Sequence, residues 1–160
     1  MKHITVILAA IFLSSSASGA LTVSRDYETE ILGNWICKDF WPGYAAFEMI
    51  RYKKDGTWNS FGEVIVDFPI EENYLKVRYG AVGTGLWEIE DDNLISMIDY
   101  VKVTNRNHSW IDEYFNMQDQ FTLNEKTSEE IVVLSDNYIN LKPNTGKARD
   151  MSATKSNYRL

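Results

Sequence analysis

The sequence predicts an all-β protein, a single antiparallel up-and-down β-barrel of about eight strands with a short helix or two. Three Gly-x-Trp triplets, at 33–35, 56–58 and 85–87, open or lie within alternating apolar and polar runs. Glycine in a strand permits a bend or a close backbone approach, and a tryptophan two positions on returns to the same face of the pleat. The connections between the runs are too short for the crossover helices that parallel strands require.

Segments rich in aromatic and β-branched residues are the candidate strands. They are 34–40, 45–53, 57–66, 74–79, 85–90, 94–103, 120–123, 131–134 and 138–141. The clearest hairpin spans 47–66 around Asp55-Gly56, because a two-residue type I′ turn needs positive φ at both central positions. We expect residues 24–32 to form a short helical or irregular lead. The spacing in 109–117 favours a short amphipathic helix across a barrel end, although a bulged strand also fits.

The first 20 residues have the layout of a secretory signal peptide. One lysine precedes an apolar core from Ile4 to Leu13, and a small-residue site, Ser18-Gly19-Ala20, follows. The apolar core is shorter than the roughly 20 residues that a membrane span needs. We therefore expect a signal peptide at 1–20, one domain at 21–142, a flexible tail at 143–160, and a periplasmic or secreted protein with no membrane-spanning segment.

Charge and cysteine content narrow the class of partner. The formal net charge is −7, and removing the signal peptide takes away Lys2 and leaves 15 basic against 23 acidic residues, a charge of −8. This acidity disfavours nucleic acid as a partner. Cys37 is the only cysteine, so no internal disulfide can form, and we expect its thiol to point inward.

The residue census predicts no catalytic site, metal or cofactor. His108 is the only histidine beyond the signal peptide, and it lies in a predicted turn without a nucleophile motif nearby. One histidine and one cysteine cannot supply the three or four nitrogen or sulfur ligands of a zinc or copper site. A glycosidase needs only two carboxylates, but nothing in the sequence pairs the strand acids. Those acids are Glu48, Glu63, Asp67, Glu88 and Asp99.

A short leading segment followed by Leu32-Gly33-Asn34-Trp35 and a meander of hairpins resembles the bacterial lipocalin-like (calycin-type) exported barrels, over about residues 26–142. The resemblance implies that Gly33 and Trp35 close the bottom of the barrel. It also implies that a basic residue, Lys142 or Arg149, packs across the indole ring of Trp35. The run Gly85-Leu86-Trp87-Glu88-Ile89 also fits the pattern of the bacterial domains. The chain departs from true lipocalins in its lack of a disulfide and in Ile98-Asp99-Tyr100, a partial match to their Thr-Asp-Tyr motif.

Two functions remain open at this level. The first, implied by the resemblance, is binding of a small apolar or amphipathic ligand inside the barrel, although large aromatics can equally fill an eight-stranded interior. The candidate lining residues are Phe47, Met49, Trp58, Phe61, Tyr79 and Met97. The second is an exported protein-interaction module, an immunity or inhibitor protein or an envelope-assembly accessory, that uses exposed aromatics. Those aromatics are Phe40, Trp41, Tyr44, Trp110, Tyr114 and Phe115.

Overall fold

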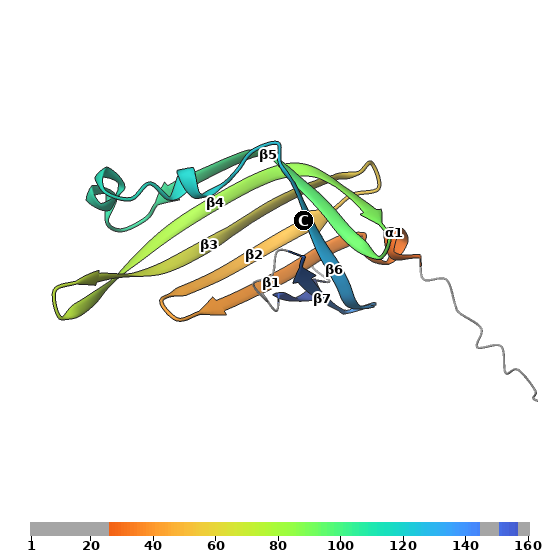
Figure 1. Ribbon diagram of the computed structural model, residues 1–160, viewed down its shortest axis with the longest axis horizontal. Coiled ribbons are helices and arrows are strands. Elements are labelled where there is room, and N and C mark those ends of the chain that lie inside the picture. Colours follow the sequence, from red (N-terminus) through yellow and green to blue (C-terminus); the bar gives the residue numbers. More distant parts are fainter. Residues whose placement is uncertain (1–25, 145–150, 157–160) are drawn as a thin grey trace, which may run out of the picture.

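Antiparallel strands follow one another around a barrel in the computed structural model, which describes residues 26–144 and 151–156 (Figure 1). Each strand pairs with the next one along the chain, and β8 pairs with both β7 and β1. The elements are α1 Tyr27–Glu30, β1 Gly33–Trp41, β2 Tyr44–Tyr52, β3 Thr57–Ile70, β4 Asn73–Glu90, β5 Asn93–Asn105, the 3-10 helices η1 Ser109–Glu113 and η2 Met117–Gln120, β6 Lys126–Ser135, β7 Tyr138–Pro143 and β8 Met151–Ser156. The predicted all-β, up-and-down antiparallel barrel is confirmed.

One end of the barrel is closed by α1 and a first core cluster. The cluster consists of Ile31, Trp35, Ile50, Tyr52, Trp58, Trp87, Leu94, Ile131, Leu134, Ile139 and Leu141. Trp35 is fully buried there, and its Nε1 donates a hydrogen bond to the Ile31 carbonyl at 2.7 Å. The Trp87 indole donates to the carbonyls of Lys53 and Thr57, both at 3.0 Å. Buried tryptophans need such partners for the indole N–H. Two of the Gly-x-Trp triplets therefore tie the chain to this end of the barrel.

At the opposite end lies the segment with η1 and η2 (Figure 1), and a second core cluster packs against it. Val77 and Tyr79 of β4 are almost completely buried there against Ile111 and Met117 of the two 3-10 helices. The Phe68 ring, near the end of β3, meets the Phe115 ring edge-on at 5.1 Å. The segment between β5 and β6 thus caps a barrel end as predicted, but as two 3-10 turns instead of one amphipathic helix.

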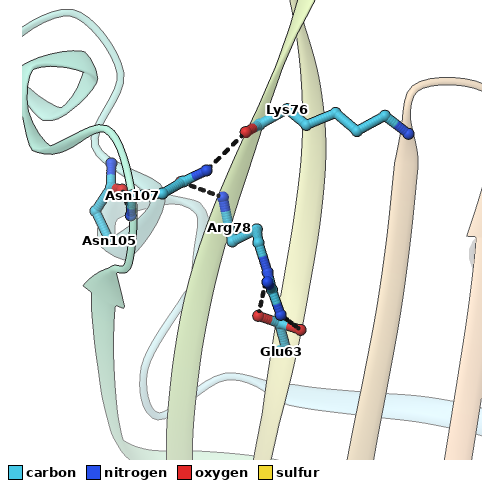
Figure 2. A network of polar contacts seen from close by, with 5 residues as sticks. All are labelled: Glu63, Lys76, Arg78, Asn105 and Asn107. Carbon is cyan, nitrogen blue, oxygen red and sulfur yellow. Dashed lines mark hydrogen bonds and ion pairs between the residues drawn. The ribbon is translucent and has the colours of Figure 1, made fainter.

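A polar network on the outer surface holds the chain to β4 where β5 ends (Figure 2). The Asn107 side chain accepts a hydrogen bond from the Arg78 backbone N–H and donates one to the Lys76 carbonyl, each at 2.9 Å. It thereby satisfies backbone groups of β4 beyond the last paired residue of β5. On the same strand, the Arg78 guanidinium makes a bidentate pair with Glu63 of β3, with both contacts at 2.8 Å.

The pairing of β5 with β6 covers only Asn93–Met97. Beyond it, the side-chain amide of Gln118 in η2 takes the place of a neighbouring strand on β5. Its Oε1 accepts from the Val103 N–H at 2.8 Å, and its Nε2 donates to the Val101 carbonyl at 3.0 Å. The predicted strand at 120–123 is wrong, because this segment begins in η2 and continues as irregular chain along the free edge of β5.

Other sequence predictions need smaller corrections. The segments 74–79 and 85–90 are parts of one long strand, β4, which pairs with β3 from Asn73 to Leu86. The hairpin around Asp55-Gly56 is confirmed, but only Gly56 has positive φ, so the turn is not type I′. Asp91 and Asp92, between β4 and β5, have positive φ at both positions.

The predicted tail also differs from the structure. Residues 151–156 form β8, which closes the barrel between β7 and β1. The sequence of this short strand shows little alternation. Its pairing is determined by the free edges of β1 and β7, between which it lies. In the register of this strand, Lys155 lies opposite Trp35, whereas the Lys142 ammonium lies 3.9 Å from the Glu130 carboxylate. Arg149 and the predicted signal peptide lie outside the described residues.

Candidate ligand-binding cavity

The barrel interior is hollow between the two core clusters. Two adjoining compartments, of about 140 Å³ and about 210 Å³, lie there and are partly open to solvent. They share Glu48, Trp58, Ile98 and Phe121 as lining residues, so these four side chains mark the junction. Together the compartments reach the lower end of the roughly 300–1,000 Å³ typical of small-molecule sites.

The walls of both compartments are mainly apolar, with a few polar groups. The compartment toward η1 and η2, called the upper compartment, is bounded by Tyr44, Ala46, Ser60, Val64, Ala81, Gly83 and Val101 besides the junction residues. The one toward α1, called the lower compartment, is bounded by Trp35, Cys37, Ile50, Tyr52, Ser96, Thr127, Glu129, Ile139 and Leu141 besides the junction residues. Apolar walls with few convergent polar groups are the usual composition of a ligand pocket.

Strand alternation explains why Glu48 faces the cavity. It lies in β2 between the inward-facing Ala46 and Ile50, and it pairs with Cys37 of β1 and Gly62 of β3, which share its face. At Gly62 a Cβ would overlap the Phe47 carbonyl oxygen and would come within 2.9 Å of the Glu48 Cα. Glycine is therefore required for β2 and β3 to run this close together beside Glu48.

A β-bulge sets which residues of β5 face the cavity. Gly85 pairs with Ile98 and Thr84 pairs with Tyr100, which leaves Asp99 as the extra residue. The bulge shifts the phase of the strand, so that Leu94, Ser96 and Ile98 face inward before it and Val101 and Val103 after it. Simple alternation over 94–103 assigns the inward residues before and after the bulge to opposite faces, so it predicts the inward face wrongly. The exposed Asp99 accepts a hydrogen bond from the Thr84 hydroxyl.

The Trp58 ring forms the floor of the junction. It lies over Gly85, the residue opposite it in β4, and its Nε1 donates to the Leu86 carbonyl at 3.1 Å. A Cβ on Gly85 would lie 2.7 Å from this ring and would overlap the Met97 carbonyl oxygen. The glycine of one Gly-x-Trp triplet is therefore covered by the tryptophan of another triplet, across the strands, and not by its own.

Burial raises the pKa of several groups around the cavity. Desolvation raises the pKa of the Glu48 carboxyl, and a hydrogen bond from Ser60 opposes that rise. Desolvation also raises the pKa of the Cys37 thiol, and the nearby Glu48 and Glu129 carboxyls raise it further. The pKa of the Tyr52 hydroxyl is raised by burial first, then by Cys37, and then by the Glu129 and Glu48 carboxyls. The interior is therefore a weakly solvated site in which acidic groups influence one another.

The predicted lining residues fall on both faces of the sheet. Trp58 lines both compartments, and Tyr79 faces inward but is buried in the second core cluster. Phe47 and Phe61 are 38% and 46% exposed on the outer surface, although Phe47 also borders the upper compartment through its strand. Met49 alternates with Glu48 and Ile50 and so faces outward. Met97 borders a separate outer hollow beside Lys126.

Sequence reasoning missed the polar groups of the interior. The sequence does not distinguish Glu48 and Glu129 from strand acids that face solvent, but both lie on the inner face of the sheet, Glu48 opposite Gly62 and Glu129 opposite Leu94. Their phase could have been recovered from Ile50 and Ile131, the apolar residues two positions further on. Phe121 lies outside any strand, and its position depends on how η2 docks on β5, which no local pattern specifies.

Cys37 and His108, the thiol and the imidazole singled out in the sequence, lie in β1 and in the turn after β5. The raised pKa keeps the Cys37 thiol protonated, and the thiolate is the nucleophilic form. His108 takes part in a turn, in which its N–H donates to Asn105 Oδ1 and its carbonyl accepts from Asn105 Nδ2. Over 26–144, no group of three or more His, Cys, Asp and Glu side chains is placed to hold a metal ion. Among the described residues, no helix has the length and apolarity to cross a membrane.

Comparison with known proteins adds no family assignment. No family model matches the chain, and no curated protein matches its sequence.

Proposed function

We propose that this chain is an exported, non-enzymatic, lipocalin-like protein that binds one small apolar or amphipathic ligand inside its barrel. The observation that supports the proposal most strongly is the pair of adjoining interior compartments between two well-packed barrel ends. Large side chains close both ends, yet the middle contains Ala46, Ser60, Gly62, Ala81 and Gly83, which leave the space open. A barrel selected for stability alone would fill such a space, because protein interiors are packed densely.

Binding of an environment-sensitive apolar dye, N-phenyl-1-naphthylamine, tests the proposal. We expect its fluorescence to rise on addition of the protein and to saturate at one dye per chain. The matched variants are neighbours on β4. Ala81→Leu adds three carbon atoms to the upper-compartment wall. Val82 also borders that compartment, but its side chain is 46% exposed on the outer face of the strand, so Val82→Leu adds its one carbon there. Binding should weaken about tenfold or more in Ala81→Leu and persist in Val82→Leu. Equal binding by both variants would place the dye outside the barrel.

An exported protein-interaction module is the second candidate, and the outer face of the barrel favours it. Met49 pairs with Phe61, and Phe61 pairs with Val82, so these outward-facing apolar residues form a row across β2, β3 and β4. Phe61 and Val82 are each 46% exposed. Exposed contiguous apolar surface often marks a protein interface. A polypeptide that co-purifies with the wild type but not with Phe61→Asp would support this function over ligand binding.

A further inference from the structure

We propose that the interior site is built for a cationic amphiphile, a primary or secondary alkylamine whose ammonium group binds Glu48 at the junction of the two compartments. This inference rests on the proposed ligand-binding function and adds the charge and chemistry of the ligand to it. Three features of the interior carry it: the position of Glu48, the supply of hydrogen-bond acceptors, and the shape of the apolar walls.

Glu48 lies where it can contact the head group of a ligand whose apolar chain extends into either compartment. It borders both compartments and lies on the inner face of the sheet, away from the exposed acids of the turns. The hydrogen bond that the structure gives this carboxyl comes from the Ser60 hydroxyl of the facing strand. A carboxylate removed from water costs free energy unless a donor or a cation compensates for it. A bound ammonium would supply both.

The polar groups of the cavity are mostly acceptors. Among the lining residues with described side chains, none is Lys, Arg or His. Glu48 borders both compartments, and Glu129 borders the lower one. Three of the lining hydroxyls already make hydrogen bonds, Ser60 with Glu48, and Ser96 with Thr127 at 3.0 Å. A carboxylate or phosphate head group would face the like charge of Glu48 and Glu129. An ammonium offers N–H donors and no acceptor, which complements this interior.

Aromatic walls also favour a cation at the junction. The Trp58 ring borders both compartments beside Glu48, and Tyr52 lies in the wall of the lower one. The face of an indole ring attracts ammonium groups, best of all where water is excluded. Apolar residues continue away from the junction in both directions, toward Val64 and Val101 above and Ile139 below. The alkyl chain of the amine would lie along one of these walls.

The test compares three ligands with the same chain and different head groups: decylamine, decan-1-ol and decanoate. Each is titrated against the wild-type protein near neutral pH by displacement of N-phenyl-1-naphthylamine, with isothermal titration calorimetry as a second measurement. We expect decylamine to bind about tenfold or more tightly than decanol, and decanoate to bind most weakly. Equal affinity for the three, or tightest binding of decanoate, would overturn the inference.

Isosteric variants assign the effect to the inward-facing acids. Glu48→Gln should reduce the preference for decylamine over decanol about tenfold, because decylamine loses its charged partner. Glu129→Gln provides a second inward variant, and Glu130→Gln on the same strand is the control, because Glu130 is exposed and pairs with Lys142 outside the barrel. Retention of the full amine preference in both inward variants would overturn the inference. Failure of the dye and of all three ligands to bind would instead refute the proposed function itself.

Discussion

The contact between Trp58 and Gly85 predicts that two glycine substitutions on one strand have very different costs. Gly83 and Gly85 both lie in β4 beneath the Trp58 ring, two positions apart on the same face. At Gly85 a Cβ would overlap the Met97 carbonyl oxygen and lie 2.7 Å from the ring, so Gly85→Ala must push β4 and β5 apart. At Gly83 the nearest atoms, Ser60 Oγ and the Trp58 ring, lie 3.4 Å away.

These distances predict different changes in the free energy of unfolding for the two variants. Overpacking typically costs about 1–3 kcal/mol, and displacing a paired strand adds the loss of backbone hydrogen bonds at about 1 kcal/mol each. We therefore expect Gly85→Ala to lower the free energy of unfolding by about 3 kcal/mol. Gly83→Ala requires small side-chain shifts and gains about 0.4–1 kcal/mol from the restricted unfolded chain. Its net effect should lie within about 1 kcal/mol of zero.

Urea unfolding, followed by tryptophan fluorescence, measures both variants against the wild type. With a slope of about 1–3 kcal/mol per molar urea, the midpoint for Gly85→Ala should fall by about 1 M or more, while that of Gly83→Ala should hardly move. Equal midpoints for the two variants would refute the packing of Trp58 on Gly85 and with it the description of the cavity floor.

Two further predictions concern stability. Glu48→Gln should stabilise the protein at neutral pH and have little effect near pH 4. The folded state keeps the Glu48 proton to a higher pH than the unfolded state does, so the wild type loses stability as pH rises above the ordinary glutamate pKa of about 4.3 and through the raised pKa, whereas glutamine does not titrate. Urea midpoints of both proteins across pH 4–8 check this, and a constant difference between them would contradict it. Trp35→Phe should cost about 2–4 kcal/mol, because it removes a fully buried indole and its hydrogen bond to the Ile31 carbonyl. The 50% exposed Trp110→Phe is the control, and a similar loss in both would refute the role of Trp35.

The strand order and most hairpins could be predicted because their signals are local. The alternation in 45–53 and 57–66 and the turn at Asp55-Gly56 specify one hairpin without help from distant residues. Turn conformation was harder, since Asp91-Asp92 and not Asp55-Gly56 has positive φ at both positions. The side chain of Asp55 accepts instead from the Thr57 N–H and hydroxyl, which supports a different turn.

The cavity could not be predicted at the same level because it depends on phase and on long-range closure. An alternating strand has two faces, and in β2 the aromatic Phe47 lies on the outer one while Glu48 faces the interior. One extra residue, Asp99, reverses the faces within β5, and another irregularity between Ile131 and Val133 does so in β6. Phe121 and β8 are placed by the strand edges they meet, which are built from residues far away in sequence.

Native mass spectrometry tests the ligand-binding account most directly. The protein would be purified from the cells that normally make it, and the mass of the folded sample compared with that of the same sample after denaturation. The account predicts an additional mass of a few hundred daltons that is lost on unfolding and is absent from Ala81→Leu prepared in the same way. A wild-type chain with no bound small molecule, or one that carries a polypeptide instead, would contradict it.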